Sequence, residues 1–242
     1  MPRTRRTSPK EAADWWESEP REQYWCEITD RPDAGADVKC PKTRENGGRD
    51  WSYDLILQVQ PGDIVYHYST RQKAFVGASV AGGPVEARDI VWAPHGTSGR
   101  AKRQARNARA GWWRPLFGFH ESHNPLKLAD PRNPVDEAWI REWITNKGTE
   151  GRVAAPFQRY SGELRASQGY LTKMPADFVE RWGQLGQLAN GVQAVQDAVA
   201  TASPTTTSIE GGVPVEPRAV VRLKNDGDYL AVVTGGLQRR TT

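Results

Sequence analysis

The sequence contains little sulfur and no long apolar segment. Only two of its 242 residues are cysteines and only two are methionines. The Arg-rich start MPRTRRTSPK has no apolar stretch of the kind that a secretory leader contains, so Cys26 and Cys40 are predicted to be free thiols in a reducing compartment. No apolar run approaches the roughly 20 residues of a membrane-spanning helix. We therefore expect a cytoplasmic protein without a membrane partner.

Sequence patterns of common enzymes are also missing. The chain has neither a GxSxG nor a GxxxxGK[ST] pattern, which argues against an α/β-hydrolase and a P-loop enzyme. His120 and His123 are accompanied by no Cys or acidic pair with metal-ligand spacing, so no metal is predicted. We expect a binding module, not an enzyme, with no cofactor. An enzyme that acts on a small nucleotide or base is the alternative.

Acidic residues are absent from one long basic run. Lys and Arg outnumber Asp and Glu by only 33 to 29, but no acid interrupts residues 100–114. Side chains of one sign repel each other unless something anionic lies nearby, so the run predicts contacts with a nucleic-acid backbone. A solvated loop leading into a strand is the alternative. The predicted contacts are Arg100, Lys102, Arg103, Arg106, Arg109 and Arg114.

Short β-prone segments alternate with turns and a few helices. This pattern predicts an α+β fold: a small, curved, mixed or antiparallel sheet, or a partly closed β-barrel, flanked by helices. Strands are expected at 23–29, 64–69, 74–81, 85–92 and 113–122, and helices at 51–56, from 136, and from 175 to 199. The segment 30–50 is rich in turn residues and is predicted to be a long loop.

Composition divides the chain into three parts. Residues 1–22 form a basic arm with a short helix, which Ser8 and Pro9 would start. Residues 23–200 form the main domain. Residues 201–242 form a linker rich in Ser, Thr, Pro and Gly, followed by a hairpin-like pattern around Asn225 to Gly227 that is too short to be a domain.

Two aromatic segments are candidates for base recognition. The 30–50 loop ends on Trp51-Ser52-Tyr53, and the strand 64–69 ends on Tyr68-Ser69. A base that leaves its stack needs flat aromatic surfaces and a few polar partners, which these residues could supply. Trp112 and Trp113 follow the basic run, and within a strand they would point to opposite faces. A Trp51 that merely covers the core is the alternative.

The runs YWCEITDR and DWSYDLILQVQPGDIVYHYSTRQKAFVGASVAG resemble the EVE domain of the PUA-like superfamily, to which YTH domains are related. The likeness lies in the order of an aromatic strand, the strand 62–69 that begins with Gly-Asp, and the strand 75–80. It covers about 24–170. The insertion 89–111 departs from the family pattern and leaves one wall of the site undefined.

The resemblance implies a site that turns a modified base out of a nucleic acid into an aromatic cage. Trp51 would be the first wall, and Trp113 or Trp112 the second. The implied polar contacts come from Thr29, Asp30 and Ser52. Tyr53, Tyr68 and Ser69 complete the candidate set.

The predicted ligand is double-stranded DNA that carries a modified base. We expect 5-methylcytosine or 5-hydroxymethylcytosine rather than N6-methyladenine, with RNA that carries a modified ribonucleotide as the alternative. The terminal DYLAVVTGGLQRRTT resembles the lead-in to a nuclease domain. The chain is therefore predicted to be the base-flipping specificity module of a modification-dependent restriction enzyme, with its oligomeric state left open.

Overall fold

The computed structural model describes residue 16 and residues 19–93, 107–127, 137–146, 155–160, 163–201, 219–222, 229–233 and 236–240. The strands are β1 Tyr24–Ile28, β2 Asp37–Pro41, β3 Ile64–Ser69, β4 Ala74–Ala81, β5 Glu86–Val91, β6 Ala108–Lys127, β7 Phe157–Tyr160, β8 Glu163–Ala166, β9 Leu171–Lys173, β10 Ala219–Arg222, β11 Tyr229–Val233 and β12 Gly236–Arg240. The helices are α2 Trp51–Asp54, the 3₁₀ helix η1 Leu55–Leu57, α4 Glu137–Asn146, α5 Ala176–Arg181 and α6 Gly183–Thr201.

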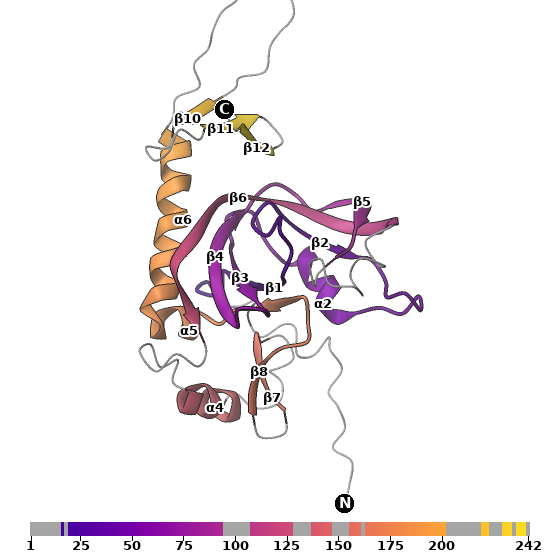
Figure 1. Ribbon diagram of the computed structural model, residues 1–242, viewed down its shortest axis with the longest axis vertical. Helices are drawn as coiled ribbons and strands as arrows, with labels where there is room; N and C mark the ends of the chain where they lie inside the picture. Colours follow the sequence, from indigo (N-terminus) through magenta and orange to yellow (C-terminus); the bar gives the residue numbers. More distant parts are fainter. Residues whose placement is uncertain are drawn as a thin grey trace, which may run out of the picture.

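Seven strands form one strongly curled sheet (Figure 1). Its main order is β2-β6-β4-β3-β1-β9, and β5 pairs with β6 beyond the end of β4. The pair β1–β3 is parallel, whereas the other pairs are antiparallel. The predicted α+β class with a curved mixed sheet is confirmed.

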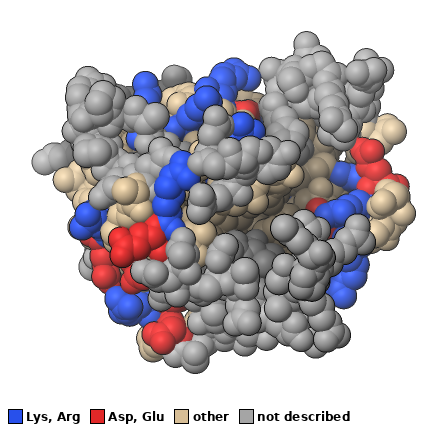
Figure 2. Space-filling view, turned by 90° about the horizontal axis from the view of Figure 1, so that it is seen from below, with Lys and Arg blue, Asp and Glu red and all other residues tan. Residues whose placement is uncertain are grey.

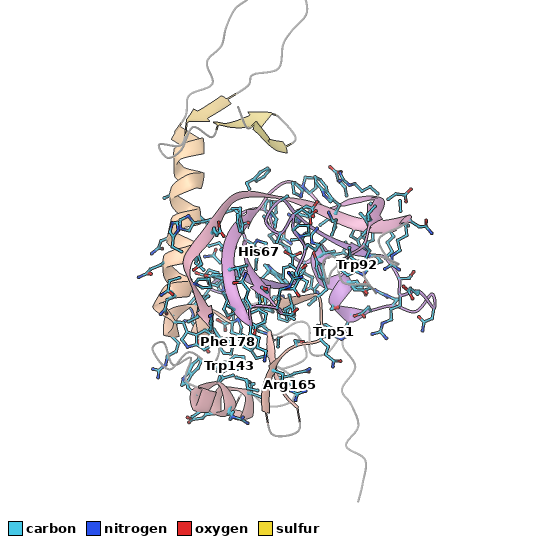
Figure 3. All side chains as sticks on the ribbon, in the orientation of Figure 1. Trp51, His67, Trp92, Trp143, Arg165 and Phe178 are labelled. Carbon is cyan, nitrogen blue, oxygen red and sulfur yellow. The ribbon has the colours of Figure 1, made fainter. Side chains whose placement is uncertain are left out.

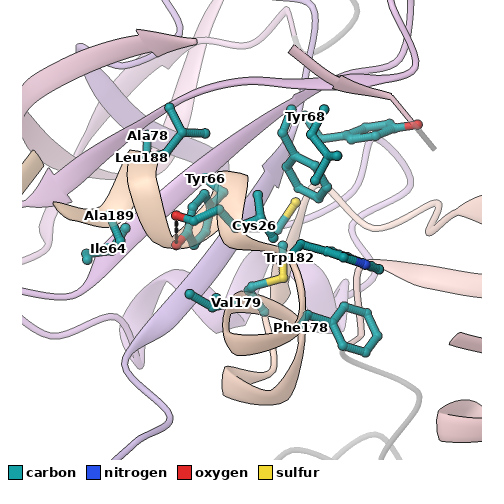
Figure 4. Packing of buried hydrophobic residues seen from close by; sticks show 14 of the residues in the cluster. Cys26, Ile64, Tyr66, Tyr68, Ala78, Phe178, Val179, Trp182, Leu188 and Ala189 are labelled. Atoms are coloured by element: carbon teal, nitrogen blue, oxygen red, sulfur yellow. Dashed lines mark hydrogen bonds between the residues drawn. The ribbon is translucent and has the colours of Figure 1, made fainter. Parts of the chain in front are cut away.

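One face of the sheet packs on α5 and α6 and is almost entirely apolar. Strand alternation places Cys26 of β1 and Tyr66 of β3 in a cluster with the helix residues Phe178 and Leu188 (Figure 4). The Tyr66 hydroxyl donates to the carbonyl oxygen of Leu185 at 2.9 Å. Each fully buried side chain of this size contributes roughly 1.5–3 kcal/mol, so this face carries much of the stability.

The opposite face lies inside the curl and combines apolar with charged residues. Trp25 and Val65 on this face pack with Leu55 and Ile56 of the short helical segment that follows residue 50. Glu27 and His67, which come two residues later on the same strands, are also completely buried. The inner face therefore contains a polar layer beside its apolar core.

The predicted loop 30–50 is partly wrong, because it contains strand β2. Val38 and Cys40 of β2 point into the inner core and are fully buried. The strand is held by its antiparallel pairing with residues 111–115 of β6. Such a pairing between distant segments leaves little local signal in a five-residue strand bounded by turn residues.

The single helix predicted for 175–199 is wrong, because two helices, α5 and α6, fill this region. Trp182 between them has φ −108° and ψ 97°, outside the helical region, and its ring joins the core. Gly183, a poor helix former, follows at the start of α6. The break turns the chain so that both helices cover the same face of the sheet.

The remaining strands include one that is longer than predicted, three that were not predicted and a predicted hairpin. Strand β6 covers 108–127, longer than the predicted 113–122, because it pairs successively with β5 and β4. The hairpin β7–β8 and strand β9 were not predicted. The predicted C-terminal hairpin is confirmed as the antiparallel pair β10–β11. The N-terminal helix prediction lies outside the described residues apart from Trp16, whose ring packs edge-on against Trp25 at 5.9 Å.

Candidate nucleic-acid interface

Helix α2 is fixed at its first turn by Asp50. One carboxylate oxygen of Asp50 accepts hydrogen bonds from the Ser52 amide at 3.0 Å and from the Ser52 hydroxyl at 2.9 Å. This is the N-cap arrangement, in which a side chain satisfies a free amide at the helix start. Ser52 is thereby buried and Trp51, beside it, stays half-exposed. The predicted site residues Trp51 and Ser52 are therefore held in a defined position.

Aromatic side chains gather around α2 (Figure 3). The Trp92 ring contacts Tyr53 at 5.6 Å and Tyr170 at 4.6 Å between ring centroids, both edge-to-face. The Trp51 ring lies against the backbone of Gly169, where an added Cβ would come within 3.0 Å of it. We call Trp51, Tyr53, Trp92, Trp112 and Tyr170 the α2 aromatic cluster.

The two tryptophans of β6 point to different faces of their strand, as alternation predicts. Trp112 is paired with Cys40, whose thiol donates to the Tyr53 carbonyl oxygen, so its strand neighbour links it to α2. Trp113 instead donates its indole N–H to Asp37 at 3.0 Å. Both rings are half-buried and pack against the inner core cluster, Trp112 from the strand position opposite Cys40 and Trp113 from the position opposite Lys39.

Basic side chains lie near the cluster, and two of them have no acidic partner among the residues that the structure describes. Arg44 pairs with Asp50, and Arg49 pairs with Asp54. Lys42 lies over the Trp112 ring at 4.2 Å from its centroid. Neither Lys42 nor Arg109 forms an ion pair with the described part of the chain. These two positive charges remain available to an anionic ligand.

Arg109 lies close enough to α2 to affect its electrostatics. Burial and the charge of Asp50 raise the pKa of Tyr53, and Arg109 opposes that rise. Figure 2, which views the molecule from the β7–β8 side, shows uncharged residues in a central hollow and both basic and acidic side chains on the surface around it. The predicted contact Arg109 is therefore near the aromatic cluster.

A buried polar network lies deeper inside the curl, and sequence reasoning missed it. Glu27 accepts hydrogen bonds from Arg31 at 2.9 Å and from the Tyr170 hydroxyl, and His67 Nδ1 lies 2.7 Å from its second oxygen. Arg31 also donates to Asp37 at 2.8 Å. We call Glu27, Arg31, Asp37, His67 and Tyr170 the Glu27 network.

The Glu27 network keeps its central carboxyl group ionised. Burial alone would raise the pKa of Glu27, but the Arg31 charge and the hydrogen bonds with His67 and Tyr170 lower it to about 2. The pKa of Tyr170 is raised well above its usual value, chiefly by burial. At neutral pH the network therefore holds a carboxylate, a guanidinium and a protonated phenol.

Four predicted site residues lie at the ends of β1 and β3, in other roles. The Asp30 carboxylate accepts hydrogen bonds from the Ser69 and Thr70 hydroxyls and from the Arg71 amide, and so holds the β3–β4 turn. Tyr68 is buried on the helix-facing side, edge-on to Phe75 and Phe157. The structure therefore does not bring Asp30, Tyr68 or Ser69 to α2.

The fourth of these residues, Thr29, contacts the Glu27 network. Its hydroxyl oxygen accepts a hydrogen bond from the Arg31 amide at 3.2 Å. Thr29 is itself buried, at 3% exposure. Thr29 thus holds the backbone of Arg31, a member of the Glu27 network.

Arg114 lies inside the molecule, with 4% of its surface exposed. Its guanidinium donates to the carbonyl oxygens of Gly82 and Gly83 at 2.9 and 2.7 Å. Burial lowers its pKa, while Asp63 opposes that change. Arg114 thus supports the link between β4 and β5 from within. The predicted contacts Arg100, Lys102, Arg103 and Arg106 lie outside the described residues.

Metal ligands do not cluster in the part of the chain that the structure describes. The His120 ring packs against Gly191 of α6, and its centroid lies 6.4 Å from that of His123. Cys26 and Cys40 are buried free thiols on opposite faces of the sheet. None of the described helices is long and apolar enough to span a membrane.

Comparisons with known proteins give distant structural likenesses only. No protein-family model and no curated protein matches the sequence. The N-terminal domain of Staphylothermus marinus McrB aligns at a TM-score of 0.34 with 16% identity, over 67% of this chain and 93% of that domain.

Two further solved structures align at a similar level. An NMR structure of a Rhodopseudomonas palustris protein gives a TM-score of 0.33 and 13% identity, over 68% of this chain and 93% of that one. A crystal structure of a Pseudomonas putida protein gives a TM-score of 0.36 and 9% identity, over 67% of this chain and 99% of that one. Likenesses of this size carry no functional argument, so the function is inferred from the site itself.

Proposed function

We propose that this protein binds double-stranded DNA that carries 5-methylcytosine or 5-hydroxymethylcytosine and holds the modified base against the α2 aromatic cluster. The observation that carries the proposal is Trp51, a partly buried indole beside the Asp50 cap, with its ring against Gly169. A flipped base needs such a surface, because stacking on an aromatic ring contributes roughly 1–3 kcal/mol.

The charges around the cluster support a nucleic-acid ligand. Lys42 and Arg109 carry positive charge next to aromatic rings and are not neutralised within the described residues. Contacts from such side chains to phosphates supply affinity that falls with salt and carries little sequence information. The Arg-rich segment 100–106 would add to the same contact.

Recognition of a methyl group requires a closely fitting wall. Burying one methyl contributes only about 1 kcal/mol, so selectivity also needs a pocket that cannot shrink around the unmodified base. Two contacts support such a wall in the α2 aromatic cluster: the Trp51 ring lies against Gly169, and the Tyr170 hydroxyl donates to the buried Glu27 carboxylate. We infer that this support gives the cluster a fixed shape.

In the full-length protein we infer a role as the specificity module of a modification-dependent restriction enzyme. Residues 23–200 would be the reader, 1–22 a basic arm, and 201–242 the connection to a nuclease domain. The chain itself would then be a binding module and not an enzyme. Incubation with modified duplex and Mg²⁺ should leave the DNA intact, and any product would contradict this assignment.

The test is a binding series at one moderate salt concentration. One duplex is prepared with cytosine, 5-methylcytosine, 5-hydroxymethylcytosine or N6-methyladenine at a single position, alongside an RNA duplex with 5-methylcytosine. We expect at least tenfold tighter binding, about 1.4 kcal/mol, to one modified-cytosine DNA. Equal binding to all four DNAs would overturn the proposal. Tighter binding to the RNA duplex than to any DNA would show that the ligand is modified RNA and not modified DNA.

A further inference from the structure

Tyr170 occupies a junction between the α2 aromatic cluster and the Glu27 network. Its ring packs against Trp92, and its amide donates to the Ser52 hydroxyl at 3.4 Å. Its carbonyl oxygen accepts a hydrogen bond from the Ile28 amide at 2.8 Å. Its hydroxyl donates to Glu27 and accepts from the Lys39 amide. One buried residue thus connects α2 to β1 and β2.

The same hydrogen-bonded chain continues to Trp113. From Tyr170 it runs through Glu27 to Arg31, whose guanidinium contacts Glu27 at 2.9 Å and Asp37 at 2.8 Å. The second carboxylate oxygen of Asp37 accepts the Trp113 indole N–H at 3.0 Å. Tyr170 is therefore linked to the Trp113 indole through a continuous hydrogen-bonded network.

Gly169, the residue before Tyr170, contacts the ring of Trp51. The Trp51 ring lies against Gly169, where an added Cβ would come to 3.0 Å from the indole. A shift of the Tyr170 backbone would move Gly169 and with it the surface on which Trp51 rests. Tyr170 is thus mechanically coupled to Trp51 by the chain and to Trp113 by hydrogen bonds.

We propose that Tyr170 is a positioning residue that fixes Trp51 within the α2 aromatic cluster and couples it through the Glu27 network to Trp113, and that its hold on Trp51 sets the selectivity of the site for a modified base. Its role in selectivity rests on the proposed function, whereas its role in positioning the two indoles does not. Tyr170 would not touch the ligand itself, since it is only 5% exposed.

The test compares Tyr170→Phe with Tyr66→Phe, a matched control. Tyr66 is also buried, and Tyr66→Phe loses the hydroxyl hydrogen bond to the Leu185 carbonyl oxygen on the helix-facing side of the sheet, whereas Tyr170→Phe loses the hydroxyl hydrogen bonds with Glu27 and the Lys39 amide. Indole N–H signals are recorded in ¹H–¹⁵N spectra of the ligand-free protein, with those of Trp51 and Trp113 identified from Trp→Phe variants. Binding of modified and unmodified duplexes is measured in parallel.

We expect Tyr170→Phe to shift both indole signals and to increase hydrogen exchange at the Trp113 indole at least threefold, whereas Tyr66→Phe leaves both unchanged. We also expect Tyr170→Phe to reduce the modified-to-unmodified affinity ratio at least threefold, with affinity for unmodified DNA within twofold of wild type. Should Tyr170→Phe fail to fold, Ser52→Ala removes the acceptor of the Tyr170 amide and the hydroxyl hydrogen bond to Asp50, keeps the capping bond of the Ser52 amide, and is expected to shift the Trp51 signal.

Unchanged indole signals in these variants would overturn the positioning role. Shifted signals with an unchanged affinity ratio would overturn the link to selectivity. If the wild-type protein shows no preference among the duplexes, the proposed function fails, and the spectra alone still decide whether Tyr170 positions the two indoles.

Discussion

The two faces of strands β1 and β3 differ in what they bury. On the helix-facing side, Cys26 and Tyr66 join an apolar cluster with α5 and α6. On the inner side, their neighbours Glu27 and His67 are equally buried but form a charged, hydrogen-bonded layer. The parallel register pairs Cys26 with Tyr66 and Glu27 with His67, so alternation along two strands produces both faces.

The comparison separates residues that stabilise the fold from residues that shape the site. An apolar core stabilises a sheet without a desolvation penalty for charged groups. A buried ion pair loses the hydration of both charges and often adds little net stability. The inner layer is nevertheless connected to α2 through Tyr170 and to Trp113 through Asp37. We infer that the main role of the charged inner layer is to fix the geometry of the α2 aromatic cluster rather than to stabilise the fold.

The largest effect is expected for Arg31→Met. The variant leaves Glu27, which is completely buried, and Asp37 without their guanidinium partner. Loss of one partner of a buried pair costs about 3–5 kcal/mol, measured as the free energy of unfolding in urea at pH 7. Arg21→Met, at an exposed pair with Glu180, should cost less than about 1 kcal/mol. Equal effects would show that the network is not a buried ionic unit.

Acid should weaken the inner face more than the helix-facing one. The pKa of Glu27 is about 2 in the folded protein, against an ordinary value of 4.5. Its stabilising contribution, on the order of 3 kcal/mol, is therefore present above pH 4.5 and is lost as the pH falls toward 2. Urea unfolding from pH 6 to 2 should show a smaller loss for Glu27→Gln than for the wild type. Parallel pH profiles would contradict the ionised state of Glu27.

Smaller effects are expected from the basic surface. Arg109→Gln should weaken binding to every duplex by a similar factor, about twofold to fivefold, and reduce the slope of log K against log salt by about 1. Neutralising Arg103 and Arg106 should act in the same way. Arg71→Gln, in the exposed β3–β4 turn, is the control and should leave binding unchanged. A loss confined to the modified duplex would place Arg109 in base recognition instead.

Strands with turn residues on both sides could be predicted from the neighbouring sequence alone. The bounds of β3 and β4 are those predicted, because Gly62, with φ +95°, and the polar segment 70–73 bracket β3. The start of α2 at Trp51 was also predicted, and the structure shows that Asp50 caps it. These features depend on residues within a few positions of each other.

The Glu27 network could not be predicted in the same way. Its members come from segments as far apart as Glu27 and Tyr170, which are 143 residues apart in sequence. One signal was available: Glu27 and His67 each stand in the middle of an otherwise apolar strand, which suggests a buried polar partner. The pairing of β1 with β3, which brings the two together, has no local signature.

The most direct test of the central claim is the binding preference of Trp51→Ala. Trp139→Ala is the control, because it also removes a partly buried indole, from α4. We expect Trp51→Ala to lose at least tenfold in affinity for the modified-cytosine duplex, with binding to the unmodified duplex nearly unchanged, and Trp139→Ala to keep the wild-type preference. If Trp51→Ala keeps that preference, the modified base does not bind at the α2 aromatic cluster.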